Sequence, residues 1–459
     1  MMYTSDIVIG LEIHVQLKTN TKLFCACPTE ATEPNTAICP TCLGHPGSKP
    51  VLNAKALEYG TKLALSLGCK ISPTVIFSRK TYFYPDLVKN YQITQYEVPL
   101  GNNGQIILED KKVVRIERVH IEEDPGALIH EAGGCLVDYN RSGIPLCEIV
   151  TAPDLTSPAE AREFMKKLLN VLGYLGIFDQ NTCIIKADAN ISIKEKKYTR
   201  VEVKNITGFK EIERALNYEV QRQKQQEVKR ETRGWDADKG ITYSMRTKEE
   251  EEDYGYIVET DLPIFEISQE WIRKVQQTIP ELAEQRAVRW TKEWKIDEDD
   301  ARIIATDLDV AVLFEEISRK VDPVFTARWV RREVLRLLND KKKELRETEF
   351  RKEELTELFK LLTEKKITDR IGQRIIEQLA DKKFSPAAYV KEQKLEMVAG
   401  EDILRKACEK AIAENPKAVE DYKKGEEKAI MFIIGQVMKV TKGTASPTVV
   451  KELLKGLLK

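Results

Sequence analysis

Several common features are missing from this sequence of 459 residues. It has no apolar run long enough to cross a bilayer, and its start, Met1 to Asp6, has neither the basic residues nor the apolar core of an export signal. It has no Gly-Lys dipeptide and no Gly-x-Gly-x-x-Gly pattern, which excludes the two glycine-rich phosphate loops that are recognisable from sequence. We therefore expect a cytoplasmic chain with no membrane partner. If it uses a nucleotide, metal ions and side chains must hold the phosphates.

The sequence also lacks an excess of positive or negative charge. The 73 Lys and Arg residues nearly cancel the 74 Asp and Glu residues, so that the net charge is −1. An RNA partner would therefore have to be bound by a local basic patch. The nine cysteines are an odd number, and their scatter is typical of reduced thiols in a reducing compartment.

The pattern of the chain changes near residue 290. Strand patterns and Gly-Pro turns dominate before it, and helical periodicity in Leu, Ile, Lys, Glu and Arg dominates after it. In the strand predicted over residues 7–17, apolar residues alternate with Glu12, His14 and other polar residues, and segments 187–194 and 201–204 repeat this alternation. Sheets with one apolar face are usually antiparallel and covered by helices. The sequence therefore predicts an α+β fold, with an antiparallel sheet first and an all-α part after it.

Four cysteines have a spacing that is typical of a metal site. Cys25-x-Cys27 and Cys39-x-x-Cys42 can each offer two thiolates to one tetrahedral ion. A closed site of four thiolates leaves no coordination position for a substrate, so the spacing predicts a structural Zn²⁺. The alternative is a set of unrelated buried thiols.

The polar face of the first strand carries a second candidate site. Glu12 and His14 lie two residues apart, so their side chains point the same way and can share one ion. The acidic stretch Glu122-Glu123-Asp124 can add carboxylates, and such donor sets suit Mg²⁺ or Mn²⁺. The alternative is an ordinary wet sheet surface and an acidic surface turn.

Two cations precede three aromatic side chains in the run Arg79-Lys80-Thr81-Tyr82-Phe83-Tyr84-Pro85-Asp86. Such a segment can bind phosphate and stack on a base. A buried aromatic strand with a basic edge explains the same pattern equally well, and both interpretations stay open.

These segments resemble the signature blocks of the B subunit of tRNA-dependent amidotransferases. The blocks are Gly10 to Val15, Arg79 to Asp86, Tyr91 to Ile93, Glu122 to Asp124, Val137 to Arg141, Pro145 to Val150, Asp188 to Asn190, Glu202 to Asn205 and Gly435 to Met438. The resemblance spans nearly the whole chain. The paralogous archaeal E subunit shares the N-terminal blocks, but the length of this chain leaves no room for the domain inserted there.

The resemblance implies an architecture and an activity. It implies a catalytic cradle domain over residues 1–290 with a zinc knuckle at 25–42, a helical domain over 291–404 and a helical tail over 405–459. The implied enzyme is a carbon–nitrogen ligase that uses ATP to phosphorylate the side-chain carboxylate of Glu-tRNA(Gln) or Asp-tRNA(Asn) and then transfers ammonia. The implied partners are misacylated tRNA, an A subunit that is the amidase (glutaminase) and supplies the ammonia, and a small C subunit.

The resemblance also implies roles for single residues. The positions expected to hold Mg²⁺ or Mn²⁺ are Glu12, His14, Glu123 and Asp188. The positions expected to be catalytic are Lys80, Glu123, Asp188 and Glu202, with Lys80 and Asp188 placed where the ammonia path opens. The positions expected to bind ATP are Arg79, Lys80, Tyr82 and Lys204.

A competing interpretation is a zinc-knuckle RNA-binding protein without catalysis, which does not account for the acidic and histidine residues of the first strand. Either protein would bind RNA through the C-terminal helices, where basic residues recur at Arg328, Arg331, Arg332, Arg336, Lys439, Lys442, Lys451 and Lys455. Because Glu333 is interleaved, a solvated helix surface explains the arginines nearly as well.

The means to release ammonia from glutamine are also missing. No two serines are adjacent, so there is no Gly-Ser-Ser run of the kind that amidase-signature enzymes use. Five cysteines outside the metal-like spacing lie in apolar or helical contexts and are predicted to be buried thiols: Cys69, Cys135, Cys147, Cys183 and Cys408. We therefore expect a separate amidase.

Overall fold

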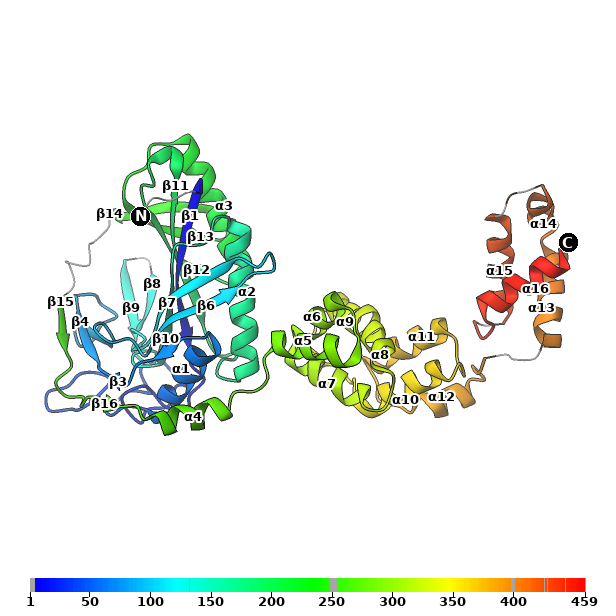
Figure 1. Cartoon of the computed structure of the whole chain (residues 1–459). Helices are drawn as coiled ribbons and strands as arrows, with labels where there is room; N and C mark the ends of the chain where they lie inside the picture. The colour runs from blue at the N-terminus through cyan, green and yellow to red at the C-terminus, as the bar shows by residue number, and fades with distance from the viewer. Residues whose placement is uncertain are drawn as a thin grey trace. The chain divides into compact units, whose positions relative to one another are not determined.

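The computed structural model describes residues 5–131, 133–247, 255–397, 401–424, 426, 428–441 and 443–458 (Figure 1). The chain divides into two compact units, Met1–Glu281 and Leu282–Lys459, and each is described here by itself. The first unit is built on a largely antiparallel sheet and the second is helical, so the α+β prediction is confirmed. The domain limits expected at residues 290 and 404 stay predictions.

A nine-stranded sheet forms the body of the first unit. Its strands follow the order β14 (Ile241–Thr247), β13 (Glu231–Asp236), β12 (Val201–Thr207), β11 (Ile185–Ile193), β1 (Ile7–Gln16), β10 (Pro145–Thr151), β7 (Val113–Glu123), β6 (Gly101–Ile107) and β2 (Lys70–Ile71). Neighbouring strands are antiparallel except β12 and β13. That pair is parallel, and helix α3 (Phe209–Gln225) makes the long connection that a parallel pair requires.

Three smaller sheets hold the remaining strands among the residues that the structure describes in this unit. Strands β15 (Gly255–Val258), β4 (Ser78–Thr81) and β5 (Tyr91–Thr94) form one, and β8 (Ala127–Glu131) and β9 (Gly134–Asp138) form a hairpin. The third pairs β16 (Phe265–Glu266) with β3 (Thr74–Val75). The short β4 carries the basic residues Arg79 and Lys80.

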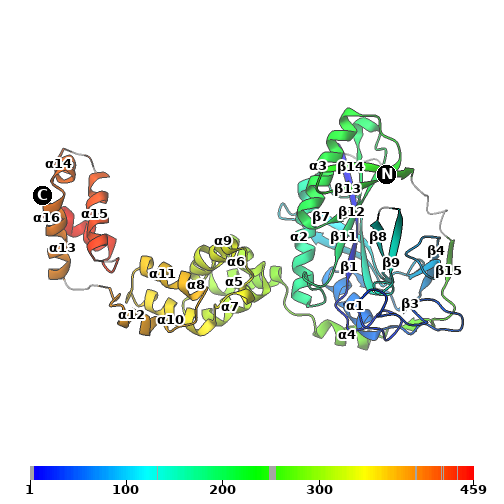
Figure 2. The same ribbon diagram turned by 180° about the vertical axis from the view of Figure 1, so that it is seen from behind.

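Helices cover the apolar face of the large sheet. The apolar residues of β1 at positions 9, 11, 13 and 15 are at most 1% exposed, as the alternation predicts. Helix α1 (Ala54–Ser66) packs against β6 and β7, α3 packs against β11 and β12, and α2 (Pro158–Leu175) contacts α1 and α3. Figures 1 and 2 show α2 and α3 on one side of β1 and the β8–β9 hairpin on the other. Helix α4 (Gln269–Gln277) packs on α1.

Local sequence fixes both ends of α2. Ser157 accepts a hydrogen bond from the backbone N–H of Glu160 at 3.2 Å, and Pro158 occupies the first turn, where its missing N–H costs nothing. Gly176 ends the helix with φ +63°, a conformation that favours glycine. The helix is therefore held in one register over the sheet.

In its described residues, the second unit consists of helices around two hydrophobic cores. The helices are α5 (Ala283–Trp294), α6 (Glu298–Ala305), α7 (Leu308–Ser318), α8 (Pro323–Trp329), α9 (Leu335–Lys341), α10 (Lys352–Thr363), α11 (Asp369–Leu379), α12 (Pro386–Glu392), α13 (Glu401–Glu414), α14 (Pro416–Lys423), α15 (Lys428–Val440) and α16 (Pro447–Leu457). One core takes residues between 287 and 395, and the other takes residues between 404 and 458. Within the described part of the chain, no helix is long and apolar enough to cross a membrane.

Candidate active site

The face of the large sheet opposite the helices carries a row of charged side chains. The strand register places Glu12 beside Asp188, and His14 beside Glu148. Glu148 in turn lies beside His120 on β7. Side chains two residues apart share a face, which extends the row along each strand. We call this set the sheet floor: Glu12, His14, His120, Glu122, Asp124, Glu148, Asp188, Glu202 and Lys204.

Two histidines and two glutamates of the floor form a tight group, which we call the His–Glu cluster: His14, His120, Glu122 and Glu148. His14 Nε2 lies 3.3 Å from Glu148 Oε2 and 3.5 Å from Glu122 Oε1. His120 Nε2 lies 3.4 Å from one oxygen of each glutamate. Ligand atoms of His14, Glu122 and Glu148 all lie within 4.8 Å of one another, which is close enough to share one ion.

Mutual pairing sets the charges in this cluster. Burial lowers the pKa of His14, but the hydrogen bond and the charge of Glu148 outweigh it and raise the pKa to about 10. Burial likewise lowers the pKa of His120, and the charge of Glu148 with the hydrogen bond to Glu122 raises it to about 9. Burial raises the pKa of Glu148, whereas His120 and His14 hold it well below its usual value. Two imidazoliums thus balance two carboxylates, and a divalent ion can take the place of their protons.

The donor set of the His–Glu cluster fits a hard divalent cation. Two carboxylates and one imidazole are ligands that Mg²⁺ or Mn²⁺ accepts, and few nitrogens disfavour softer ions. Thr94 Oγ1 donates to Glu122 Oε2 at 2.9 Å and so orients that carboxylate from outside. The cluster can therefore hold an ion in a fixed position on the floor.

Glu12 lies in the neighbouring half of the floor, together with three other predicted site residues. Lys204 Nζ lies 2.9 Å from Asp188 Oδ2 and 3.2 Å from Glu202 Oε1. Burial, followed by the charges of Glu148 and Glu202, raises the pKa of Glu12. Burial lowers the pKa of Lys204, but the charges of Asp188 and Glu202 raise it well above its usual value. Lys204 therefore brings a fixed positive charge into an acidic group.

The structure does not bring Glu123 together with Glu12 and His14. Glu123 Oε1 accepts from Lys89 Nζ at 2.5 Å and from the backbone N–H of Ile93 at 2.9 Å. Successive side chains of a strand point to opposite faces, so Glu122, and not Glu123, reaches the floor. The metal role expected for Glu123 stays a prediction, but Glu122 is the neighbour whose carboxylate lies with His14 and Glu148.

The structure places Arg79, Lys80 and Tyr82 on and beside the small sheet of β4. Arg79 binds the buried carboxylate of Glu259 with two hydrogen bonds of 2.7 Å, and its guanidinium lies 4.6 Å from the centre of the Tyr91 ring. Lys80 Nζ lies 5.9 Å from the centre of the Tyr82 ring. Because Arg79 is already paired with an anion, it is poorly placed to bind phosphate.

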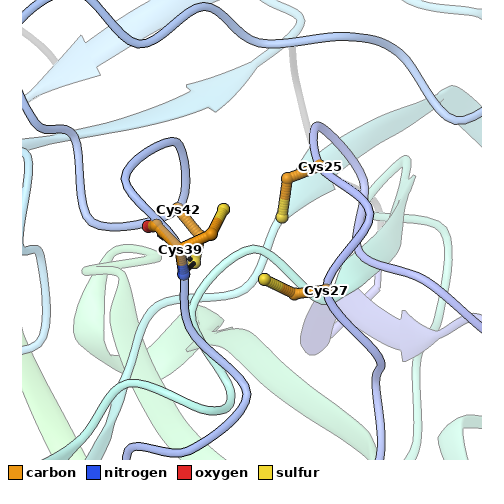
Figure 3. Close-up of side chains that lie close together, drawn as sticks. All are labelled: Cys25, Cys27, Cys39 and Cys42. Atoms are coloured by element: carbon orange, nitrogen blue, oxygen red, sulfur yellow. Dashed lines mark hydrogen bonds between the residues drawn. The ribbon is translucent and has the colours of Figure 1, made fainter.

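The four cysteines with metal-like spacing gather from two loops (Figure 3). Their sulfur atoms all lie within 4.8 Å of one another, and the sulfurs of Cys25 and Cys27 point toward the loop of Cys39 and Cys42. That loop turns tightly, because the N–H groups of Leu43 and Gly44 bond back to the carbonyls of Cys39 and Thr41. The hydrogen bond from the Cys25 thiol, opposed by burial, lowers the pKa of Cys42 to about 4. This all-sulfur donor set fits a soft or borderline cation such as Zn²⁺.

The remaining five cysteines differ in exposure. Cys69, Cys147 and Cys408 are buried, as predicted. The prediction is wrong for Cys135, which is exposed, and for Cys183, which is half-buried. Cys135 lies in the β8–β9 hairpin, where even Leu136 is 55% exposed, so an apolar sequence context does not imply a core position there.

Sequence reasoning missed His120 and the site role of Glu148. Strand β10 is buried on both faces along most of its length, so it shows no alternation of polar and apolar residues. His120 lies on the same face as Glu122, and this spacing of two is a signal that could have identified it. Only the strand register brings both residues to His14.

The basic residues proposed to bind RNA are unequally available. Arg331 pairs with Asp300, and Arg336 lies 3.0 Å from Glu333 and 3.1 Å from Asp340. Among the described residues, Arg328 and Arg332 make no ion pair, and both are exposed. Of the four tail lysines proposed above, Lys439, Lys451 and Lys455 are exposed. Lys442 lies outside the described residues.

A charged floor on a largely antiparallel sheet, followed by a helical unit, is typical of an α+β enzyme. The chain belongs to the GatB family, because residues 7–273 match the GatB/GatE catalytic domain and residues 312–458 match the GatB domain. It is 43% identical over 474 aligned positions to a Thermotoga maritima protein named as the B subunit of aspartyl/glutamyl-tRNA(Asn/Gln) amidotransferase, with 98% of both chains covered. It is 42% identical to a protein of the same name from Carboxydothermus hydrogenoformans, with 99% of this chain and 98% of the relative covered. It is also 42% identical to a protein of that name from Clostridium botulinum, with 98% of both chains covered. These full-length matches do not favour a non-catalytic RNA-binding protein.

Proposed function

We propose that this chain is the component of a tRNA-dependent amidotransferase that converts Glu-tRNA(Gln) or Asp-tRNA(Asn) to the amide. The observation that carries the proposal is the His–Glu cluster on the floor of a GatB/GatE catalytic domain. The name of the relatives, which describes them as the B subunit of aspartyl/glutamyl-tRNA(Asn/Gln) amidotransferase, supports the same activity.

The chemistry explains why such a floor is needed. A carboxylate is a poor acyl donor and must first be activated. One of its oxygens attacks the γ-phosphorus of ATP, which forms an acyl phosphate and releases ADP. Ammonia then attacks the acyl carbon and loses a proton, and inorganic phosphate leaves with the former carboxylate oxygen. The first transfer depends on positioning and on neutralising charge more than on covalent catalysis.

In this proposal the His–Glu cluster binds the cation. His14, Glu122 and Glu148 would hold Mg²⁺ or Mn²⁺, which supplies positive charge to the phosphate oxygens when it is bound. Thr94 and His120 hold the two carboxylates in orientation. The residues of this chain thereby fix where the phosphate of the nucleotide lies.

The other half of the floor would serve the reacting acyl group. Lys204 offers its ammonium beside Asp188, and the backbone N–H of Asn205 donates to Asp188 Oδ1 at 3.0 Å. A fixed cation here can neutralise charge that develops on the acyl phosphate. We further propose that Asp188 and Lys80 lie along the route by which ammonia arrives.

The four-cysteine knuckle has a structural role in this scheme. Four thiolates leave no open position on a tetrahedral ion, so a Zn²⁺ bound there would hold the two loops together without touching substrate. The partners we propose are the amidase (the A subunit), a small C subunit and misacylated tRNA, with the complex located in the cytoplasm.

One assay tests the proposed activity and identifies the substrate. The complex is supplied with ATP, Mg²⁺, glutamine and either Glu-tRNA(Gln) or Asp-tRNA(Asn), and the amide product is measured. The proposal expects amide formation that stops when His14→Ala or Glu148→Gln is introduced into this chain. Normal amide formation by the doubly substituted chain would contradict it.

A further inference from the structure

Lys22 is fully buried, with 0% of its surface exposed. Lysine is almost never fully buried unless it is paired, because an ammonium loses its hydration in the interior. The structure must therefore supply an anion or strong acceptors at its Nζ. The groups that its Nζ contacts belong to the four-cysteine knuckle and the chain beside it.

The Lys22 ammonium points at the knuckle. Its Nζ lies 3.7 Å from Cys42 Sγ and 3.2 Å from the carbonyl oxygen of Tyr139. The carbonyl carries no net charge, so Cys42 is the partner that can be an anion. The carboxylate of Glu123 lines the same cavity, but it is bound by Lys89.

Cys42 receives a second donor on the same sulfur. The backbone N–H of Cys39 donates to Cys42 Sγ at 3.1 Å. Two N–H donors on one sulfur stabilise the thiolate, which is the form that binds a metal. Four thiolates around a divalent ion leave two negative charges in excess, and one ammonium offsets one of them.

The backbone of Lys22 belongs to the other half of the knuckle. Its N–H bonds to the carbonyl of Cys27 at 2.9 Å, and its own carbonyl accepts from Asn53 Nδ2 at 3.3 Å. The main chain of Lys22 is thus tied to the Cys25–Cys27 loop, whereas its ammonium reaches Cys42. One residue therefore links both loops of the site.

We infer that Lys22 is a positioning residue of the cysteine site: its buried ammonium contacts the sulfur of Cys42, offsets the excess negative charge of the metal site and joins the two ligand loops. This inference rests on the proposal that the four cysteines bind a thiophilic divalent cation. Removing the ammonium should weaken metal binding even though all four ligands remain.

The test compares Lys22→Met with Lys89→Met in the full chain. Both replace a nearly buried lysine at the same cavity by a side chain of similar length, but only Lys22 contacts a cysteine. Zinc affinity is measured by competition with a chelator, and the rate at which iodoacetamide alkylates Cys42 is followed by mass spectrometry. Lys22→Met should weaken zinc binding by about 10- to 100-fold, the usual effect of losing an outer partner of a metal ligand. In the zinc-loaded protein it should also speed alkylation of Cys42, because a zinc ion that is bound more weakly protects its ligands less. Lys89→Met should change neither.

The following outcomes decide the inference. Zinc affinity within twofold of wild type in folded Lys22→Met overturns it. If Lys22→Met does not fold, Lys22→Arg is measured instead, because it keeps all four ligands and a cation at the site; zinc affinity within tenfold of wild type supports the charge pairing, and a larger loss overturns it. A wild-type chain that binds no zinc overturns the metal proposal itself, and that failure is visible in the wild-type arm alone.

Discussion

Glu122 and Glu123 are neighbours in β7, yet their carboxylates contact different groups. Glu122 lies 3.5 Å from His14 Nε2, whereas Glu123 is bound by Lys89 at 2.5 Å. The alternation of a strand separates them, so that a shift of one residue moves a side chain to the other face. We therefore propose Glu122, and not Glu123, as the ligand of an ion on the floor.

The first prediction follows from this pair. Glu122→Gln should weaken Mn²⁺ binding at the floor at least about 100-fold, because it removes a ligand and leaves His14 and His120 with one carboxylate. Amide formation on misacylated tRNA should fall with it. Mn²⁺ binding is measured by electron paramagnetic resonance of the free ion.

Glu123→Gln is the matched control, since it makes the same chemical change one residue away. It should leave Mn²⁺ affinity at the floor unchanged, whatever it does to the Lys89 contact. Equal loss of Mn²⁺ binding in both variants would contradict the assignment.

Much of the fold could be predicted from the sequence, because alternation and helical periodicity are local properties. The pattern of β1 predicted both its buried face and the polar face that carries Glu12 and His14. The partners of His14 could not be predicted, because they depend on which strands lie beside β1. Sequence order does not give the order β11-β1-β10-β7, and β10 is buried on both faces, which hides Glu148 from any alternation rule.

The second prediction concerns the cysteine knuckle. The purified chain should contain about one zinc per molecule, and Cys25→Ser should lower both the zinc content and the thermal midpoint, because binding a structural ion is coupled to folding. Cys135→Ser is the control, since Cys135 is exposed and lies outside the cluster. Elemental analysis that finds no zinc in protein purified without chelator would rule out the site.

The third prediction concerns the pair Arg79–Glu259. The Glu259 side chain is fully buried, so Glu259→Gln leaves the Arg79 guanidinium without its anion and should cost about 3 kcal/mol of unfolding free energy at pH 7. Burial raises the pKa of Glu259, but the hydrogen bonds from Arg79 outweigh it and lower the pKa below 4.5. A lowered pKa gives stability that is present above pH 4.5 and is lost as the pH falls through the folded-state value.

The difference in thermal midpoint between wild type and Glu259→Gln should therefore be constant near neutral pH and shrink below about pH 4.5. Glu270→Gln is the control, because Glu270 and its partner Lys274 are both exposed. Ion pairs at the surface contribute little to the free energy of unfolding. A difference that grows as the pH falls would mean that the ion pair is not its source.

The fourth prediction separates two kinds of arginine in the second unit. The logarithm of the affinity for tRNA should fall with the logarithm of the salt concentration. Replacing Arg328 and Arg332 with glutamine should make this fall shallower by about 2 units of slope, because each exposed cation can contact one phosphate. Replacing Arg331 and Arg336 should change the slope less, since both already pair with carboxylates. Filter binding over a salt series measures the slopes, and equal slopes in wild type and the first variant would assign these arginines to a solvated surface.

The last prediction concerns the source of ammonia. The isolated chain should hydrolyse glutamine no faster than background, because glutamine hydrolysis needs an activated nucleophile beside a base. Burial raises the pKa of Cys69 to about 12 and also raises the pKa of Cys147, so both thiols stay protonated at neutral pH. Cys135 is the exposed thiol outside the knuckle, and the neighbouring residues of β9, Gly134 and Leu136, are exposed as well, so water has free access to this thiol.

Amide formation with glutamine should therefore require the separate amidase. Ammonium chloride at a pH near 9 should partly replace that enzyme, because the nucleophile is the unprotonated form. The measurement compares amide formed from glutamine and from ammonium chloride, with and without the amidase. Glutamine turnover by this chain alone that disappears in Cys135→Ala would show that the chain supplies its own ammonia, and the division of labour between the two proteins would have to be abandoned.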